Sequence, residues 1–385
     1  MKRIYLDNAA TSFPKPETVY QAVMDTLRFG GSPGRGSHQQ TLAADRQLFE
    51  TRELLAELFN APNSDHFIFT ASATMAINLA LFGLLQPGDR VVTSSMEHNA
   101  VARPLRVLQD RGINVVKVKS DPASGILDVA AVKQACLAQP TRLLCLNHCS
   151  NVTGSVQPIA QLGPWCQEQG ILFMVDAAQS AGILPLDIQA DGINLLAAPG
   201  HKGLYGPQGT GFLYFSENLD VTPLIYGGTG THSGSDQQPA QSPERYESGT
   251  HNLPGLAGLK AGLSFVKETG LKQIRERDMY HADMLLSALK NIDRVKVYGP
   301  LELEQRCEAL SFNIAGCDPA EVGFMLDRDR QISVRVGLHC APDAHRTIGT
   351  YPGGTVRVSP GWFTSDADID SFISAVKELS CSCSR

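Results

Sequence analysis

The sequence predicts an α/β protein: a large domain built on a mostly parallel, doubly wound sheet, followed by a smaller α+β domain. In the first part of the chain, short apolar runs alternate with helix-like stretches of about 10–15 residues, which is typical of βαβ units. After about Ser216 this alternation gives way to a polar loop, a long helical run and short strands. The chain has 385 residues, more than one small core needs, which also favours two domains.

The elements expected in the large domain follow one another in order along the chain. The strands are expected at 66–70, 89–95, 113–120, 141–148, 171–176, 193–199 and 209–215. The helices are expected at 74–85, 99–112, 128–139 and 158–170. Because sheets of this kind bind ligands at the carboxyl ends of their strands, we expect the functional residues directly after these strands.

The smaller domain is expected to follow a polar loop at 227–250. A helical run covers 253–290, and short strands are expected at 295–299, 309–315, 332–337 and 355–359. We therefore expect three parts: an N-terminal arm (1–15) packing with the small domain, a large domain (16–255) and a small domain (256–385). The loop is long enough to have a role of its own, which the sequence does not define.

Composition excludes several classes of function. The chain has 33 Lys and Arg against 39 Asp and Glu, a net charge of −6, which gives no case for nucleic acid or an anionic membrane as partner. No secretory signal and no apolar run of about 18–20 residues are seen. The nine cysteines are scattered, which favours reduced thiols in the cytoplasm. Cys381 and Cys383 are expected in a frayed tail, and no metal site is expected.

Polar residues follow the early strands. Ala73 and Thr74 open a helix after 66–70, where backbone N–H groups and a hydroxyl could cradle a phosphate; a plain helix cap is the alternative for Thr74. His98 follows 89–95 and could stack on a flat cofactor, or be a solvated loop histidine. Asn151 could orient an anionic ligand, or serve as a turn residue.

Asp176 and Lys202 carry the strongest chemical signal. Asp176 ends an apolar strand, where a buried carboxylate needs a cationic partner such as a protonated pyridine nitrogen. Gln179 follows on the same turn. At a strand end Lys202 would be desolvated, and a neutral amine is a nucleophile towards carbonyls. A phosphate-binding lysine is the alternative, but the order of a phosphate-binding loop is reversed here. An aspartate with a lysine in these positions is typical of a pyridoxal-phosphate site.

The chain resembles the fold-type I, class V aminotransferases, and within them the cysteine desulfurase and selenocysteine lyase branch. The resemblance covers nearly the whole chain. Its motifs occur in order: YLDNAATSFPKP, SATMAIN, MEHNAV, SNVTG, VDAAQS, GHKGLYGPQGTGF, YESGT, RVGLHCAP and VRVS.

This resemblance implies pyridoxal 5'-phosphate as cofactor and a role for each residue. Lys202 would bind the cofactor covalently and later move protons at the substrate carbon. The other implied contacts are Asp176 with the pyridine nitrogen, Gln179 with the phenolic oxygen, His98 and Ala178 with the two ring faces, and Ala73, Thr74 and His201 with the phosphate. Thr250 would reach the phosphate of a neighbouring subunit, which implies a homodimer. Asn151 and Arg357 would hold the carboxylate of an amino-acid substrate.

Cys340 lies where similar proteins carry the thiolate that accepts sulfur. The resemblance therefore implies conversion of L-cysteine to L-alanine, with a persulfide on Cys340 and a sulfur-acceptor protein as a further partner, for example in iron–sulfur assembly. A reactive thiol needs a cationic or histidine-rich setting, for which His339 and His345 are near in sequence. A buried, inert cysteine is the alternative. The short segment before Cys340 is similar to that of the SUF-type or selenocysteine-lyase-like branch.

Some features depart from the family or stay open. Pro199 stands where the family usually has a serine that donates to the phosphate. The segment after Arg357 is one residue shorter than is usual in the family. Arg35 and His38 are candidates for residues that line the mouth of the site. Selenocysteine as substrate, another class V enzyme (an aminotransferase or C–S lyase) that does not need Cys340, and a non-catalytic sulfur-assembly protein remain alternatives. A nicotinamide-dependent oxidoreductase is disfavoured, because no G-x-G-x-x-G follows the first strand.

Overall fold

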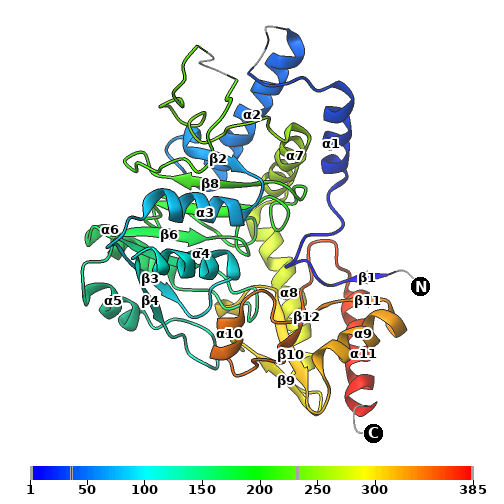
Figure 1. Ribbon diagram of the computed structural model, residues 1–385. Helices are drawn as coiled ribbons and strands as arrows, with labels where there is room; N and C mark the ends of the chain where they lie inside the picture. Colours follow the sequence, from blue (N-terminus) through cyan, green and yellow to red (C-terminus); the bar gives the residue numbers. More distant parts are fainter. Residues whose placement is uncertain (1–2, 35, 37, 231–233, 383–385) are drawn as a thin grey trace.

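The computed structural model describes residues 3–34, 36, 38–230 and 234–382. Its large unit is built on a seven-stranded sheet (Figure 1). Its strands are β2 (Phe67–Thr70), β3 (Arg90–Ser94), β4 (Asn114–Val118), β5 (Leu143–Asn147), β6 (Leu172–Asp176), β7 (Leu195–Pro199) and β8 (Gly211–Phe215). They lie in the order β2-β8-β7-β6-β5-β3-β4. All neighbouring strands run parallel except β8, which is antiparallel to both β2 and β7. The expected mostly parallel α/β sheet is confirmed.

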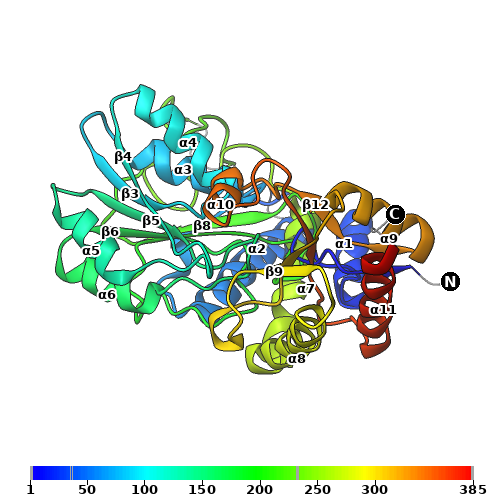
Figure 2. The same cartoon turned by 90° about the horizontal axis from the view of Figure 1, so that it is seen from below.

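Helices cover both faces of this sheet (Figure 2). One face packs against α3 (Ala73–Leu84) and α4 (Asn99–Asp110), with strand residues such as Ile68 and Leu213. The opposite face packs against α2 (Gln39–Leu58), α5 (Val129–Leu137), α6 (Ile159–Glu168) and α7 (Leu253–Thr269), with residues such as Phe67 and Phe212. Because successive side chains point to opposite faces and both faces are covered, the central strands are apolar throughout rather than alternating.

The smaller unit is an antiparallel four-stranded sheet in the order β12-β13-β10-β9. Its strands are β9 (Val295–Tyr298), β10 (Leu310–Ile314), β12 (Arg335–Gly337) and β13 (Thr355–Val358). The helices α8 (Leu271–Leu289), α9 (Pro319–Arg330) and α11 (Asp366–Ser382) share its core. The short helix α10 (Pro342–Thr347) follows β12, and one-turn helices lie at Ser64–His66 and Leu303–Gln305.

Two predicted elements are split in the structure. The helical run 253–290 breaks at Gly270, whose φ of 87° suits glycine and ends α7. Leu256 of α7 packs in the core of the large sheet and Leu285 of α8 in that of the small sheet, so the two helices contribute to different cores. The strand 332–337 divides into β11 (Ile332–Ser333) and β12 because the two pieces pair with different partners.

The two ends of the chain both lie at the small unit (Figure 1). The short strand β1 (Ile4–Tyr5) pairs in parallel with β11, and the chain then runs towards α1 (Glu17–Phe29), which packs on α7. At the other end α11 continues to Ser382, so Cys381 lies in a helix rather than in a frayed tail; Cys383 lies outside the described residues. Within the described ranges, no helix combines the length and the apolar character needed to cross a bilayer.

Candidate active site

A cavity of about 240 Å³ lies at the carboxyl ends of β5, β6 and β7, as expected for an open α/β sheet. Of the residues for which the family resemblance implies a role, all but Thr250 and Arg357 line it. These residues are Ala73, Thr74, His98, Asn151, Asp176, Ala178, Gln179, His201, Lys202 and Cys340. Residues more than 250 positions apart in the chain therefore meet in one place.

The cavity contains two ionisable side chains of opposite charge type, Lys202 and Asp176. Burial, together with the positive charge of Arg357, lowers the pKa of Lys202 to about 8, although Asp176 opposes both effects. Asp176 is 3% exposed and accepts a hydrogen bond from the Ala178 N–H at 2.9 Å. Burial raises the pKa of Asp176, while that hydrogen bond acts in the opposite direction. The site thus offers an amine that can lose its proton near neutral pH, and a buried carboxylate that needs a cation.

The two histidines of the cavity are held in neutral form. Burial, together with the charge of Lys202, lowers the pKa of both His98 and His201 to about 4. His98 caps α4: its Nδ1 accepts the Ala100 N–H at 3.0 Å, which fixes the ring at the start of that helix. The Nδ1 atom of His201 is buried and has no protein partner among the described residues, so it is available to a ligand.

The start of α3 forms one end of the cavity. Ser72, not Thr74, is the N-cap: its Oγ accepts the Met75 N–H at 3.2 Å. Thr74 is exposed and lines the cavity next to Ala73. The capping alternative for Thr74 is therefore wrong, and the hydroxyl lies beside the first-turn N–H groups of a helix N-terminus, a setting that favours an anion.

Cys340 is exposed and its sulfur has a cationic neighbour. Arg335, on β12, donates from Nη2 to the Cys340 Sγ at 3.4 Å and also lines the cavity. Exposure excludes the alternative of a buried, inert cysteine. The Asn99 N–H donates to the Cys340 carbonyl at 2.8 Å, which ties the segment to the start of α4. Arginine keeps its charge at any ordinary pH, so Arg335 is suited to hold a sulfur anion.

The histidines near Cys340 do not provide this charge. His339 and His345 are buried and bonded to the hydroxyls of Thr355 and Thr350, at 2.9 and 2.7 Å. Burial lowers the pKa of His339, and it lowers that of His345 to about 4, so both rings are neutral. The cationic setting expected for Cys340 is present, but it comes from Arg335, which the sequence reasoning missed. The only sequence signal was a charged residue inside the apolar run 332–337.

Arg357 lies behind the cavity wall rather than in it. Its side chain is fully buried; Nη1 donates to the Asn151 carbonyl at 2.9 Å and Nη2 to Asp7 Oδ1 at 2.6 Å. Asn151 lines the cavity, donates from Nδ2 to the His339 carbonyl at 2.6 Å, and has a buried Oδ1 without a partner in the described part of the chain. Asn151 and Arg357 are thus brought together as predicted, with Asp7 as an unforeseen third member.

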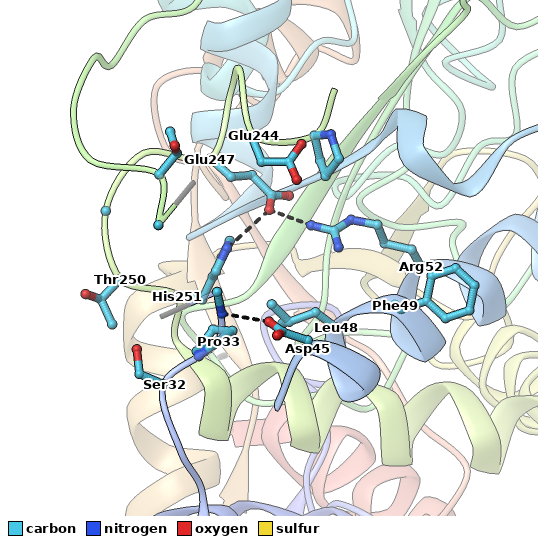
Figure 3. Close-up of a pocket in the computed structure, with 15 residues that line it drawn as sticks. Ser32, Pro33, Asp45, Leu48, Phe49, Arg52, Glu244, Glu247, Thr250 and His251 are labelled. Atoms are coloured by element: carbon cyan, nitrogen blue, oxygen red, sulfur yellow. Dashed lines mark hydrogen bonds and ion pairs between the residues drawn. The ribbon is translucent and has the colours of Figure 1, made fainter. Parts of the chain in front are cut away.

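Thr250 lines a second pocket, of about 320 Å³, shown in Figure 3. There the buried Glu247 carboxylate pairs with Arg52 at 2.5 Å and lies 3.4 Å from His251. Thr250 is exposed and does not line the cavity of Lys202 in its own chain. Part of the 227–250 loop also lines this pocket.

Two residues were also candidates for the mouth of the site. His38 caps α2 and does not line the Lys202 cavity, and Arg35 lies outside the described residues. Among the residues that the structure describes, no three His, Cys, Asp or Glu side chains are grouped so as to hold a metal ion.

Known proteins share this fold and this order of motifs. The family model "Aminotransferase class-V" matches residues 4–372, so the chain belongs to that family. Within it, the chain is 35% identical to a probable cysteine desulfurase of Methanothermobacter thermautotrophicus, over 98% of this chain and 94% of the relative. It is 34% identical to a cysteine desulfurase of Yersinia pestis, over 98% and 93%. These relatives place it in the cysteine desulfurase branch.

Solved structures agree with this assignment. The apo cysteine desulfurase from Thermococcus onnurineus superposes with a TM-score of 0.92 at 30% identity, covering 99% of this chain and 95% of the other. The cysteine desulfurase CsdA from Escherichia coli gives 0.87 at 28% identity, over 99% and 95%. The predicted fold and branch are confirmed.

Proteins of this family generally depend on pyridoxal phosphate, and the cavity fits that group. A helix N-terminus and the unpartnered Nδ1 of His201 suit its phosphate, and the buried Asp176 suits a pyridinium. The half-buried Lys202, whose pKa is lowered to about 8, suits its carbonyl carbon.

Proposed function

We propose that this protein is a pyridoxal-phosphate-dependent cysteine desulfurase that converts L-cysteine to L-alanine and carries the sulfur as a persulfide on Cys340. The observation that carries the proposal is the exposed Cys340 thiol, next to the Arg335 guanidinium, in the same cavity as Lys202. Another class V enzyme would need the lysine but not the thiol. The names of the relatives support the same activity.

The proposed binding residues follow from the geometry of the cavity. Ala73 and Thr74 at the start of α3 and the Nδ1 of His201 would hold the phosphate. Asp176 would keep the pyridine nitrogen protonated, His98 and Ala178 would enclose the ring, and Gln179 would contact the phenolic oxygen. When bound, the cofactor accepts the electron pair left at the substrate carbon.

Lys202 is the proposed base. Because its pKa is about 8, part of the amine is neutral near physiological pH and can remove the proton from the substrate Cα. The ammonium form can return a proton to the product, so one group serves both directions.

Cys340 is the proposed sulfur acceptor. Its thiolate attacks the substrate sulfur, a bond forms between the two sulfur atoms, and the bond between that sulfur and the substrate Cβ breaks. The electron pair of the broken bond stays with the carbon skeleton, which is protonated to alanine. Arg335 stabilises the anionic sulfur at Cys340. Asn151, with Arg357 behind it, would orient the substrate carboxylate.

The partners are part of the same proposal. Exposed Thr250, in a pocket apart from Lys202, suits a residue that completes the phosphate site of a second copy in a homodimer. A protein that accepts sulfur from Cys340 is the second expected partner. The cytoplasm remains the expected location, on the scattered cysteines of the sequence.

Product analysis tests the activity. Purified protein should be yellow, lose that colour with borohydride, and release alanine from L-cysteine, while mass spectrometry should find a persulfide on Cys340. Parallel reactions with L-selenocysteine identify the preferred substrate. Cys340→Ala should abolish alanine release, and Cys381→Ala, which removes another exposed cysteine, should not. Alanine release at the wild-type rate by Cys340→Ala, or a protein unable to take up pyridoxal phosphate, would contradict the proposal.

A further inference from the structure

Residues 7–15, here called the N-terminal strap, link the small unit to the turn that carries Lys202. At its beginning, the Leu6 N–H donates to the Ser333 carbonyl at 2.9 Å and the Asn8 N–H to the Ser359 carbonyl at 3.1 Å. Further on, Ala10 lines the Lys202 cavity. The strap therefore does more than pack with the small domain.

Asp7 anchors the strap at the substrate-binding side. Its Oδ1 accepts from Nη2 of Arg357 at 2.6 Å, and Asp7 is the only carboxylate recorded in contact with this guanidinium among the described residues. Arg335 stands directly opposite Arg357 in the β12–β13 pair, so two like charges lie close together. A carboxylate at Nη2 fixes the plane of the Arg357 guanidinium and offsets part of this repulsion.

Lys15 anchors the other end of the strap. Its Nζ donates to the His201 carbonyl at 2.9 Å and to Ser12 Oγ at 2.8 Å. Ser12 Oγ in turn donates to the Lys202 carbonyl at 3.0 Å, and Thr11 Oγ1 to the His201 carbonyl at 3.1 Å. These groups hold the backbone of the two residues whose side chains face the cavity.

The turn they hold needs support. Tyr205 has a φ of 57°, unusual for an aromatic residue, and the Gly206 N–H closes the turn onto the Gly200 carbonyl at 2.7 Å. The middle of the strap is also tied to the site, since Gln179 Nε2 donates to the Ala9 carbonyl at 3.0 Å.

We propose that the N-terminal strap is a positioning element with two separable anchors: Asp7 positions Arg357, which holds Asn151 at the substrate carboxylate, and Lys15 positions the turn that carries Lys202. This inference rests on the proposed function. Neither side chain lines the cavity, so both are positioning residues rather than catalytic ones. Loss of a hydrogen bond to a charged group should cost about tenfold in the step that it supports.

Two variants separate the anchors. Asp7→Asn should raise the KM for L-cysteine about tenfold and leave kcat within about twofold. Lys15→Met should lower kcat about tenfold and weaken pyridoxal phosphate binding about tenfold, with KM within about twofold. Lys15→Arg, which keeps a cationic donor, should retain most of the wild-type kcat and pyridoxal phosphate binding. Asp327→Asn, which breaks the pair with Arg3, and Lys260→Met, which breaks the pair with Glu50, are the matched controls and should behave as wild type.

A third measurement does not depend on turnover. In the cofactor-free protein, Lys15→Met should speed amide hydrogen exchange across residues 200–206, and Asp7→Asn should not. If Lys15→Met does not fold, Ser12→Ala removes the hydroxyl that accepts from Lys15 Nζ and donates to the Lys202 carbonyl, and should act in the same direction. The inference is wrong if Asp7→Asn and Lys15→Met change the same kinetic parameter, or if amide exchange at residues 200–206 is unchanged in Lys15→Met. A wild-type protein without alanine release would instead contradict the proposed function, and the exchange result would still decide on the strap.

Discussion

Arg335 and Arg357 lie directly opposite each other on β12 and β13, yet they face different partners. Arg335 lines the cavity and donates to the sulfur of Cys340, while Arg357 is fully buried and paired with Asp7. Burial lowers the pKa of Arg357, and the charge of Arg335 adds to this effect. Both guanidinium groups also lower the pKa of Lys202. Two adjacent arginines thus bind two different groups, the Cys340 sulfur in the cavity and the Asp7 carboxylate behind its wall.

Arg335→Gln should slow the reaction of Cys340 with iodoacetamide about tenfold near neutral pH, because the sulfur anion loses its charged donor. The rate of alkylation, followed by mass spectrometry of the Cys340 peptide, measures the effect. Arg346→Gln is the control: this exposed arginine pairs with Asp343 instead. An unchanged rate in Arg335→Gln would show that Arg335 does not support the thiolate.

Lys202→Met should stabilise the cofactor-free protein at pH 7. The pKa of Lys202 is about 8 in the fold and 10.5 as its ordinary value, so between these values the unfolded chain binds more protons. The free energy of unfolding should therefore rise with pH between these two values. Below pH 8 the folded protein bears the full free-energy cost of burying a charged amine. Its removal should add on the order of 3 kcal/mol at pH 7, shrinking towards pH 10.5.

Urea unfolding of the cofactor-free proteins at several pH values checks this prediction. Lys267→Met, in an exposed pair with Glu57, serves as control and should shift the free energy of unfolding by about 1 kcal/mol or less. A Lys202→Met protein that is less stable than wild type at pH 7 would contradict a lowered pKa of Lys202 in the folded protein.

Pro199→Ser should tighten pyridoxal phosphate binding. Pro199 ends β7 and lines the cavity, where a serine would add a hydroxyl and an N–H. One new hydrogen bond to a charged phosphate corresponds to a dissociation constant about tenfold lower. Absorbance titration of the cofactor-free protein gives this constant, with Pro185→Ser, at an exposed proline, for comparison. Equal or weaker binding would show that other groups already satisfy the phosphate.

Arg52→Met should destabilise the protein by about 3–5 kcal/mol, because it leaves the buried Glu247 carboxylate without its main cation. Chemical unfolding measures the loss. Arg46→Met breaks an exposed pair with Glu50 and should cost no more than about 1 kcal/mol. Equal effects of the two substitutions would mean that the Arg52–Glu247 pair is not a distinct support of the Thr250 segment.

The sequence predicted the sheet and the motifs well, for a physical reason. In a parallel sheet covered on both faces, the strands are continuous apolar runs, and ligand-binding residues follow their carboxyl ends. Asp176 and Lys202 could therefore be identified from the sequence around them. Arg335, Asp7 and Lys15 could not. Asp7 meets a partner 350 positions away, and Lys15 acts on the backbone of His201. Contacts with backbone carbonyls leave no residue pattern to detect.

The backbone that carries Cys340 is tied to two neighbouring parts of the site. Cys340 and His339 both have left-handed φ values, 59° and 47°, and the segment is tied down at the Asn99 N–H and the Asn151 amide. While these bonds hold, the sulfur moves by rotation of the Cys340 side chain, which shifts it by no more than a few bond lengths. Under the proposed function, a molecule that accepts sulfur from Cys340 would therefore have to bring its own nucleophile into the mouth of the cavity.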